Sequence, residues 1–488
     1  MDDMSQYITI ELPNTQFSVR TTPLHIFIVL LLIPLQKLLP REIWVGIILM
    51  LSTLDCKSLA LTCSALHSFV SIVAPFRTVI IDKQHKLHLL HLLHSPFVLQ
   101  ATKEVRWIGP DPLPSRWSGG RMRRSEENFE TGYIFNDLIT LFSNSRATTL
   151  HLSYVTLRAE HLDAMYALPN LTSLSLDCIT HSAGSRMGHL ISSVKTLSIE
   201  QAVASEKTRE YPPIRPFLAH SITTLIIHNV RRLGGNLATE AILPSLTTVG
   251  LIEQKHTLRL SDLPIGFLAA QKTIHTLDLC FKFKFDNTLV PRPAQFLPML
   301  RRLTCLSDWY PVLPRRPLKV YHKYLMYDYY TPGHHQGPFG TVHDDLFVTA
   351  NRTTLVELCI PILLASLGDT LRMLSELPLL QHLDLFLLRS SSTEAFVPPE
   401  GTNAELGKMA TLEYLSMAFT LSDAQLNTEP LPETCVSIFT EFVLPMCPVA
   451  KEIEFKAVTA PIFFGVEEQK WWLRYWKDKD GIWVKRFI

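Results

Sequence analysis

A short hydrophobic phrase recurs along most of this chain and restricts its possible folds more than any other feature. The phrase is an apolar residue, two other residues, an apolar residue, one other residue and a third apolar residue, as in Leu171, Leu174 and Leu176. Such alternation predicts a short β-strand with one buried face. The middle apolar residues of the copies are Leu150, Leu174, Leu197, Leu225, Val249, Leu277, Leu303, Leu358, Leu383, Leu415 and Ile453. The steps up to Leu303 are 23 to 28 residues long, which predicts a solenoid whose neighbouring repeats pair their strands.

The chain between successive copies has room for a loop and a helix that cover one side of the strands. Residues 158–168 show helical spacing of apolar side chains between the first two copies. The step from Leu303 to Leu358 is about twice the usual length, and it leaves open whether 310–345 holds a degenerate repeat or an inserted loop. An ordinary α/β sheet is the alternative architecture.

The residues that alternate with the buried positions face the opposite side of each strand. If Leu174 and Leu176 point into the core, their neighbours lie on the strand face that solenoids use for binding. The candidate target-binding residues on this concave face are Ser173, Ser175, Asp177, Ser198, Glu200, His228, Asp278, Asp384, Phe386 and Tyr414. Arg302 and Lys456 are the only permanent cations at these positions, so the strands do not favour an arginine pocket for a phosphorylated target. Whether the loops supply one stays open.

The overall charge and the cysteine pattern exclude several classes of partner. Lysine and arginine number 46 against 45 acidic residues, and this net charge of +1 gives no electrostatic footprint for nucleic acid. The cysteines show no paired spacing of the kind that a zinc site or a disulfide framework requires. They are Cys56, Cys63, Cys178, Cys280, Cys305, Cys359, Cys435 and Cys447. The pattern indicates buried thiols in a reducing compartment, which means the cytoplasm, the nucleus or both.

A separate helical module precedes the repeats, at residues 38–77. Pro40 suits the first position of a helix, where its missing N–H has no intrahelical partner to lose, and apolar residues follow at helical spacing. Asp55 is a suitable N-cap for a second short helix, and a third begins at Cys63 and ends before Pro75. Three short helices bury little surface by themselves, so the module is expected to lean on a partner.

The module resembles an F-box, the domain that docks onto the Skp adaptor of cullin-based ubiquitin ligases. The resemblance rests on Leu39-Pro40, Glu42-Ile43, Ile47-Ile48, Leu51, Asp55, Ser58-Leu59-Ala60, Thr62-Cys63 and Leu66. Cys56 departs from the family, which more often has leucine there. By resemblance, the residues that contact a Skp-type adaptor, and through it a cullin, are Leu39, Pro40, Glu42, Ile43, Ile47, Leu51, Asp55 and Leu59. The repeats in turn resemble the leucine-rich repeat solenoids that commonly follow an F-box.

The remaining segments are expected to be a tail, a connection and a cap. Residues 1–37 are assigned to an N-terminal tail, whose apolar stretch 24–35 is shorter than the ~18 residues that suggest a membrane span. Residues 78–149 connect the module to a solenoid at 150–465. Residues 466–488 form an aromatic C-terminal cap, in which Asp480-Gly481 predicts a hairpin.

Together these features predict an α/β chain: a short three-helix F-box-like module followed by an irregular leucine-rich repeat solenoid. We find no motif for catalytic residues, a cofactor or a metal. The interpretation is a non-enzymatic substrate adaptor of a ubiquitin ligase that holds an unknown target protein, and neither nucleic acid nor a membrane is expected as a partner. Two alternatives stay open: a leucine-rich repeat scaffold outside any ligase, and a membrane-anchored receptor.

Overall fold

The computed structural model divides the chain into two compact units, Met1–Thr156 with Leu168–Leu174, and Leu157–Ala167 with Ser175–Ile488. The residues that the structure describes are 7–12, 15–20, 67, 78–81, 96–109, 127–157, 159–181, 192–202, 218–228, 230, 242–253, 258–259, 263–281, 283–284, 296–305, 317–323, 348–363, 367–388, 408–420, 444–458, 469–478 and 480–487. Apart from His67, the F-box-like module at 38–77 lies outside them. Its helices and its adaptor-binding residues therefore stay predictions, as does the role of the apolar stretch 24–35.

The first unit is built on a small parallel sheet. Its strands are β3 (Thr78–Ile81), β4 (Glu104–Ile108) and β5 (Thr149–Ser153), which pair in that order, and its helices are α6 (Pro96–Ala101) and α7 (Glu127–Asn144). Trp107 on the buried side of β4 packs near Phe135 of α7, with ring centroids 6.1 Å apart. The predicted boundary at residue 150 therefore falls on β5, inside the parallel sheet of β3, β4 and β5.

The N-terminal segment assigned to a tail also contains regular structure. Strands β1 (Tyr7–Leu12) and β2 (Thr15–Arg20) pair as an antiparallel hairpin. The alternating polar and apolar residues of both segments are the pattern of such a ribbon.

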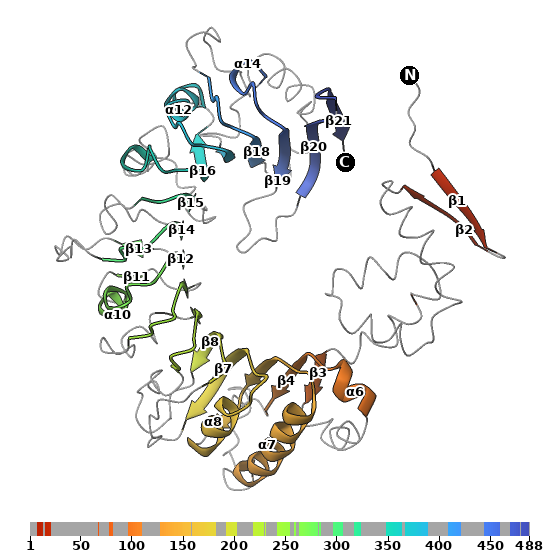
Figure 1. Cartoon of the computed structure of the whole chain (residues 1–488), viewed down its shortest axis with the longest axis vertical. Coiled ribbons are helices and arrows are strands. Elements are labelled where there is room, and N and C mark those ends of the chain that lie inside the picture. The colour runs from red at the N-terminus through yellow and green to blue at the C-terminus, as the bar shows by residue number, and fades with distance from the viewer. Residues whose placement is uncertain are drawn as a thin grey trace, which may run out of the picture. The chain divides into compact units, whose positions relative to one another are not determined.

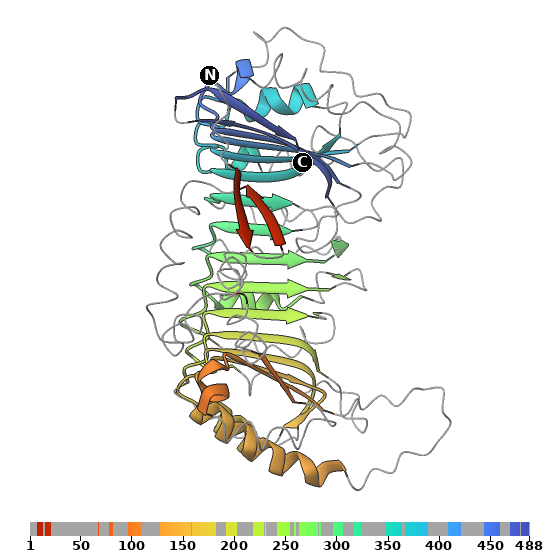
Figure 2. The same ribbon diagram turned by 90° about the vertical axis from the view of Figure 1, so that its right-hand side faces the viewer.

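The second unit contains a long parallel sheet that follows the repeated phrase. Its strands are β7 (Ser173–His181, whose first two residues belong to the first unit), β8 (Thr196–Ala202), β9 (Thr224–His228), β10 (Thr248–Ile252), β12 (Thr276–Cys280), β14 (Arg302–Cys305), β15 (Val320–Lys323), β16 (Glu357–Leu363), β17 (His382–Leu388), β18 (Tyr414–Thr420) and β19 (Glu452–Val458). From β8 to β19 each strand pairs in parallel with the next one named. Figure 2 shows these strands as successive arrows pointing the same way. The α/β class and the strand repeat are thus confirmed at this level.

Short elements lie before or between these strands. They are β6 (Thr156–Leu157), α8 (Ala159–Tyr166), β11 (Leu258–Arg259), α10 (Ile265–Ala270), β13 (Phe283–Lys284), α12 (Leu367–Leu374) and α14 (Leu444–Met446). Figure 1 shows α10 and α12 on the same side of the strands. This side carries the buried half of the repeated phrase.

Strand β15 shows that the long step between Leu303 and Leu358 contains one further strand of the repeat. Tyr321 pairs with both residues and is itself buried, so it stands where the other copies have an aliphatic residue. Residues 320–323 are therefore the strand of a degenerate copy, and of 310–345 only 317–323 belong to the described residues.

The register of the sheet follows from the repeated phrase because each middle apolar residue pairs with its equivalent in the next strand. These residues are Leu197, Leu225, Val249, Leu277, Leu303, Tyr321, Leu358, Leu383, Leu415 and Ile453. All are at most 2% exposed. A slip of one residue would turn the whole set out of the core, so burial fixes the pairing.

A recurring turn carries the chain into each strand. At β14 the N–H of Leu300 donates to the carbonyl of Leu297 at 3.2 Å, and the N–H groups of Arg301 and Arg302 both donate to the carbonyl of His275 in the preceding repeat. Equivalent turns precede β9, β10, β17, β18 and β19. The turn therefore satisfies backbone groups that would otherwise be buried without partners.

Buried amide side chains also tie one repeat to the one before it. Gln271 accepts a hydrogen bond from the N–H of Leu243 at 2.9 Å, and Asn351 accepts one from the N–H of Leu318 at 3.1 Å. Both amides are 1% exposed. Each satisfies a donor that the loop leaves inside the protein.

The parallel run ends in two antiparallel strands, β20 (Gln469–Lys477) and β21 (Trp483–Phe487). The connecting turn has Gly481 at φ 77°, and the carboxylate of Asp478 accepts hydrogen bonds from the N–H groups of Asp480 and Ile482. The hairpin predicted from Asp480-Gly481 is confirmed.

The cysteines and the helices of the described residues bear on two expectations from the sequence. Cys280, Cys305, Cys359 and Cys447 are buried thiols, and burial raises the pKa of Cys280 and Cys447 to about 12. Among the described residues, no helix is both long and apolar enough to cross a membrane.

Candidate functional site

The candidate site is the open face of the second unit, defined as the strand side that carries the residues alternating with the buried phrase. Within the described residues, α10 and α12 lie on the other side (Figure 1). The pairing register arranges the open-face residues in rows across the strands. The middle row runs Ser198, Ile226, Gly250, Asp278, Thr304, His322, Cys359, Asp384, Ser416, Glu454 and Arg474.

The predicted target-binding residues lie at outward positions of their strands. Glu200 is exposed and Phe386 is 7% exposed, whereas the others are half-buried; those are Ser173, Ser175, Asp177, Ser198, His228, Asp278, Asp384 and Tyr414. Asp177 and Glu200 both act electrostatically on His228, whose pKa is nevertheless lowered because burial outweighs them. Asp384 and Tyr414 fall in a different group, on β17 and β18.

Among the described residues of the second unit, a dense polar group spans β18, β19 and β20. The hydroxyl of Tyr414 donates to Oε2 of Glu454 at 2.8 Å, and Nζ of Lys456 lies 3.2 Å from the same oxygen. Arg474 is 2.7 Å from the carboxylate of Glu452 and 3.7 Å from that of Glu454. Glu454 is only 7% exposed. Two cations and a hydroxyl thus hold one nearly buried carboxylate, which is the arrangement that a buried charge requires.

The role of Arg474 on the open face was not predicted, because residues 466–488 were assigned to a C-terminal cap. Only the antiparallel return of β20 brings it beside Glu452 and Glu454. The signal was present as the hairpin motif that follows it, but the motif does not say which strand the hairpin joins.

Burial changes the acidity of the groups around Glu454. The pKa of the Tyr414 hydroxyl is raised by burial and by its bond to Glu454. The pKa of Asp384 is raised by burial, with Lys456 and a hydrogen bond from Ser416 acting in the opposite direction. The two groups therefore prefer their neutral forms more than they do in water.

A pocket of about 160 Å³ opens on this face, lined by Cys359, Asp384, Leu385, Phe386, Ser416, Ala418 and Lys456. Register explains its position: Cys359, Asp384 and Ser416 are neighbours in one row, and Phe386, Ala418 and Lys456 in the next. Three of the lining side chains are small, and the larger ones stand around them. The open face is therefore hollowed where cysteine, serine and alanine replace longer residues.

A second polar contact lies beside the pocket on β15 and β16. Nε2 of His322 is 2.6 Å from Oε1 of Glu357. Burial lowers the pKa of His322, although Glu357 acts to raise it. His322 is 7% exposed, so this pair is part of the floor of the open face.

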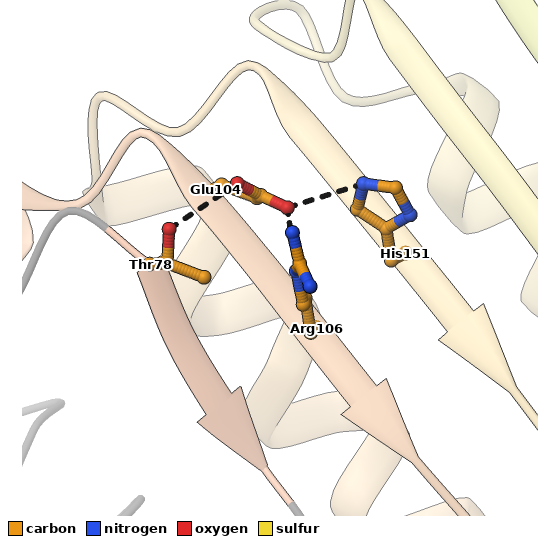
Figure 3. A network of polar contacts seen from close by, with 4 residues as sticks. All are labelled: Thr78, Glu104, Arg106 and His151. Carbon is orange, nitrogen blue, oxygen red and sulfur yellow. Dashed lines mark hydrogen bonds and ion pairs between the residues drawn. The ribbon is translucent and has the colours of Figure 1, made fainter. Parts of the chain in front are cut away.

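The first unit has its own polar network on the sheet face opposite α7. The carboxylate of Glu104 lies 2.7 Å from Nε of Arg106 and 3.1 Å from Nε2 of His151, and it accepts a hydrogen bond from the hydroxyl of Thr78 at 3.2 Å (Figure 3). The side chains of Arg106 and His151 are 50% and 36% exposed. Exposed ion pairs of this kind contribute about 0 to 1 kcal/mol. The network links the three strands β3, β4 and β5.

A scan against protein-family models finds no match, and a search of the curated proteins finds no significant similarity. Within the described residues, no group of three histidine, cysteine, aspartate or glutamate side chains is placed to hold a metal ion. The half-buried polar and aromatic groups of β16 to β20 are the features that a partner would meet.

Proposed function

We propose that this chain is a target-recognition adaptor of a Skp–cullin–F-box ubiquitin ligase. In this proposal residues 38–77 bind a Skp-type adaptor, and the open face of the second unit binds the target. The proposal thus has an adaptor half, binding of the Skp-type adaptor, and a target half, binding of the target. The target half rests on one observation, the open face of the parallel strands with its pocket.

The adaptor half is supported by the order of residues in the sequence. Leu39-Pro40, Glu42-Ile43, Asp55 and Leu59 follow one another as in an F-box, within a module too small to bury a core of its own. A module of this kind gains stability from a partner that covers its apolar face.

The target half is supported by strand geometry and by burial. A solenoid face offers outward side chains from many strands at one spacing, so a long segment of another protein can contact several strands at once. On β16 to β19 those side chains include partly buried polar and aromatic groups that a bound protein could contact. Ubiquitin transfer would then be accelerated by proximity, because the target's lysine is held at high effective concentration near the conjugating enzyme.

The test is co-purification of the full chain with a purified Skp-type adaptor. The parent chain should retain the adaptor, and the double variant Leu39→Ala, Pro40→Ala should lose it. Cys56→Leu is the matched control within the module, because it moves the sequence toward the family pattern and should bind at least as tightly.

Retention by the double variant, or no binding by a folded parent chain, would refute the ligase proposal. The second result would favour the alternative function, a repeat scaffold that binds proteins through the same open face outside any ligase. The two functions share the target half and differ in the adaptor half alone.

A further inference from the structure

The pocket on β16 to β19 is lined by both apolar and polar side chains. Cys359, Phe386 and Ala418 are packed together and are 3%, 7% and 4% exposed. Asp384 and Lys456 are its charged lining residues. Its 160 Å³ corresponds to about five waters at ~30 Å³ each, which is room for one long side chain.

The charges around this pocket are predominantly negative. Glu357 and Glu454 both act electrostatically on Asp384. Lys456 is the lining cation, and its ammonium group lies 3.2 Å from Glu454. Arg474 stands outside the lining, 3.7 Å from Glu454 and 2.7 Å from Glu452, so these two cations face four carboxylates. Lys456 is therefore shared between two carboxylates, and a further cation would improve the balance at Asp384.

Aromatic rings continue the pocket's rim along the same two strands. His382 and Tyr414 stand two residues before Asp384 and Ser416, on the same face, with ring centroids 5.9 Å apart. Aromatic faces next to a carboxylate favour a cationic group with an apolar stem.

We propose that this pocket binds a lysine or arginine side chain of the target, with its aliphatic stem against Phe386 and Ala418 and its charged end at Asp384. The inference rests on the target half of the proposed function and is independent of the adaptor half. An acidic or phosphorylated segment is the opposite possibility, and it would place a negative charge beside Asp384, Glu357 and Glu454. Negative charges brought together at one pocket repel each other, which is why the geometry favours a basic residue.

The experiment is selection of a displayed library of random twelve-residue peptides on the purified full chain. We expect lysine or arginine to be enriched at one position of the selected peptides. The best peptide should bind Asp384→Asn at least about tenfold more weakly, which corresponds to about 1.4 kcal/mol. The charge-matched control, Asp278→Asn, lies on the same face outside the pocket and should bind within about twofold of the parent chain.

Two further measurements keep the result specific to the pocket. Ala418→Leu fills the pocket without changing its charge and should weaken the same peptide, while circular dichroism checks that each variant is folded. Replacing the enriched basic residue of the peptide by glutamine should remove the difference between the parent chain and Asp384→Asn.

Enrichment of acidic or apolar residues, equal binding by Asp384→Asn, or no enrichment by a folded chain would overturn the inference. The ligase proposal is tested separately, by co-purifying the adaptor with the same preparation of the chain. If the chain does not bind the adaptor but still selects basic peptides, the pocket assignment stands and the chain is a repeat scaffold outside any ligase.

Discussion

Strands β8 to β12 and strands β15 to β19 share one core pattern and differ on their open faces. Their middle buried residues are all 0 to 2% exposed. On the outward side, the first group presents a row of threonines, Thr196, Thr224, Thr248 and Thr276. The equivalent row of the second group is Val320, Glu357, His382, Tyr414 and Glu452.

The difference lies at outward positions, which the shared core pattern does not specify. Threonine is a residue that favours strands and suits a half-exposed strand surface without a specific partner. Tyr414, Asp384 and Glu454 are instead partly buried polar groups that must find hydrogen bonds or lose stability. These groups concentrate on β17 to β19, which makes that end of the sheet the candidate binding site.

The largest expected effects test whether the two groups of strands have equivalent cores. Leu225→Ala on β9 and Leu383→Ala on β17 each remove a side chain that is fully buried. Each should lower the free energy of unfolding by about 2 to 5 kcal/mol through lost burial and a residual cavity. Chemical denaturation measures both, and a large effect in only one of them would break the equivalence.

The next effect concerns the amides that link neighbouring repeats. Gln271→Ala and Asn351→Ala each leave a buried backbone N–H without its acceptor, at Leu243 and Leu318 respectively. The free energy of unfolding should fall by about 1 to 3 kcal/mol in each case. The exposed Gln381→Ala serves as the control and should change it by less than about 0.5 kcal/mol.

The stability of the chain should depend on pH through Asp384, on the open face of the second group of strands. Because burial raises the folded-state pKa of Asp384, its contribution to stability is fully present below the unfolded value of about 3.9 and is lost as the pH rises through the folded pKa. Asp384→Asn should therefore be more stable than the parent chain at pH 7 and should lose that advantage near pH 3.

Urea denaturation at several pH values measures this difference. Ser416→Ala is the companion variant, because it removes a hydrogen bond that lowers the pKa of Asp384 and should enlarge the loss on raising the pH. A parent chain that gains stability over Asp384→Asn as the pH rises would contradict the assigned direction.

The smallest effect should come from exposed charges at the strand entries. Lys451 lies 2.7 Å from Glu413, and their side chains are 68% and 41% exposed. Lys451→Ala should change the free energy of unfolding by about 0.2 to 1 kcal/mol, and less at high salt. An effect as large as that of a buried leucine would mean that surface charge, and not the core, distinguishes this end of the sheet.

The repeated phrase predicted most of the strands because burial leaves a regular pattern in the sequence. It missed β3 and β4, whose residues Val79, Val105 and Trp107 fill the core without leucine at the usual spacing. It left β15 undecided because Tyr321 replaces the expected aliphatic residue there. Patterns of this kind are visible only where several copies use the same residue type.

The sequence by itself determined which residues are buried, the parallel register that follows from them, and the C-terminal hairpin. Tertiary structure alone decided that Arg474 returns to Glu452 and Glu454, and that Cys359, Ser416 and Ala418 meet to form a pocket beside Asp384. The physical reason is the separation along the chain of the residues that must meet. Burial is specified by a local alternation along one strand, whereas a pocket and an ion-pair network are made by side chains from strands roughly 20 to 40 residues apart, which only the pairing of those strands brings together.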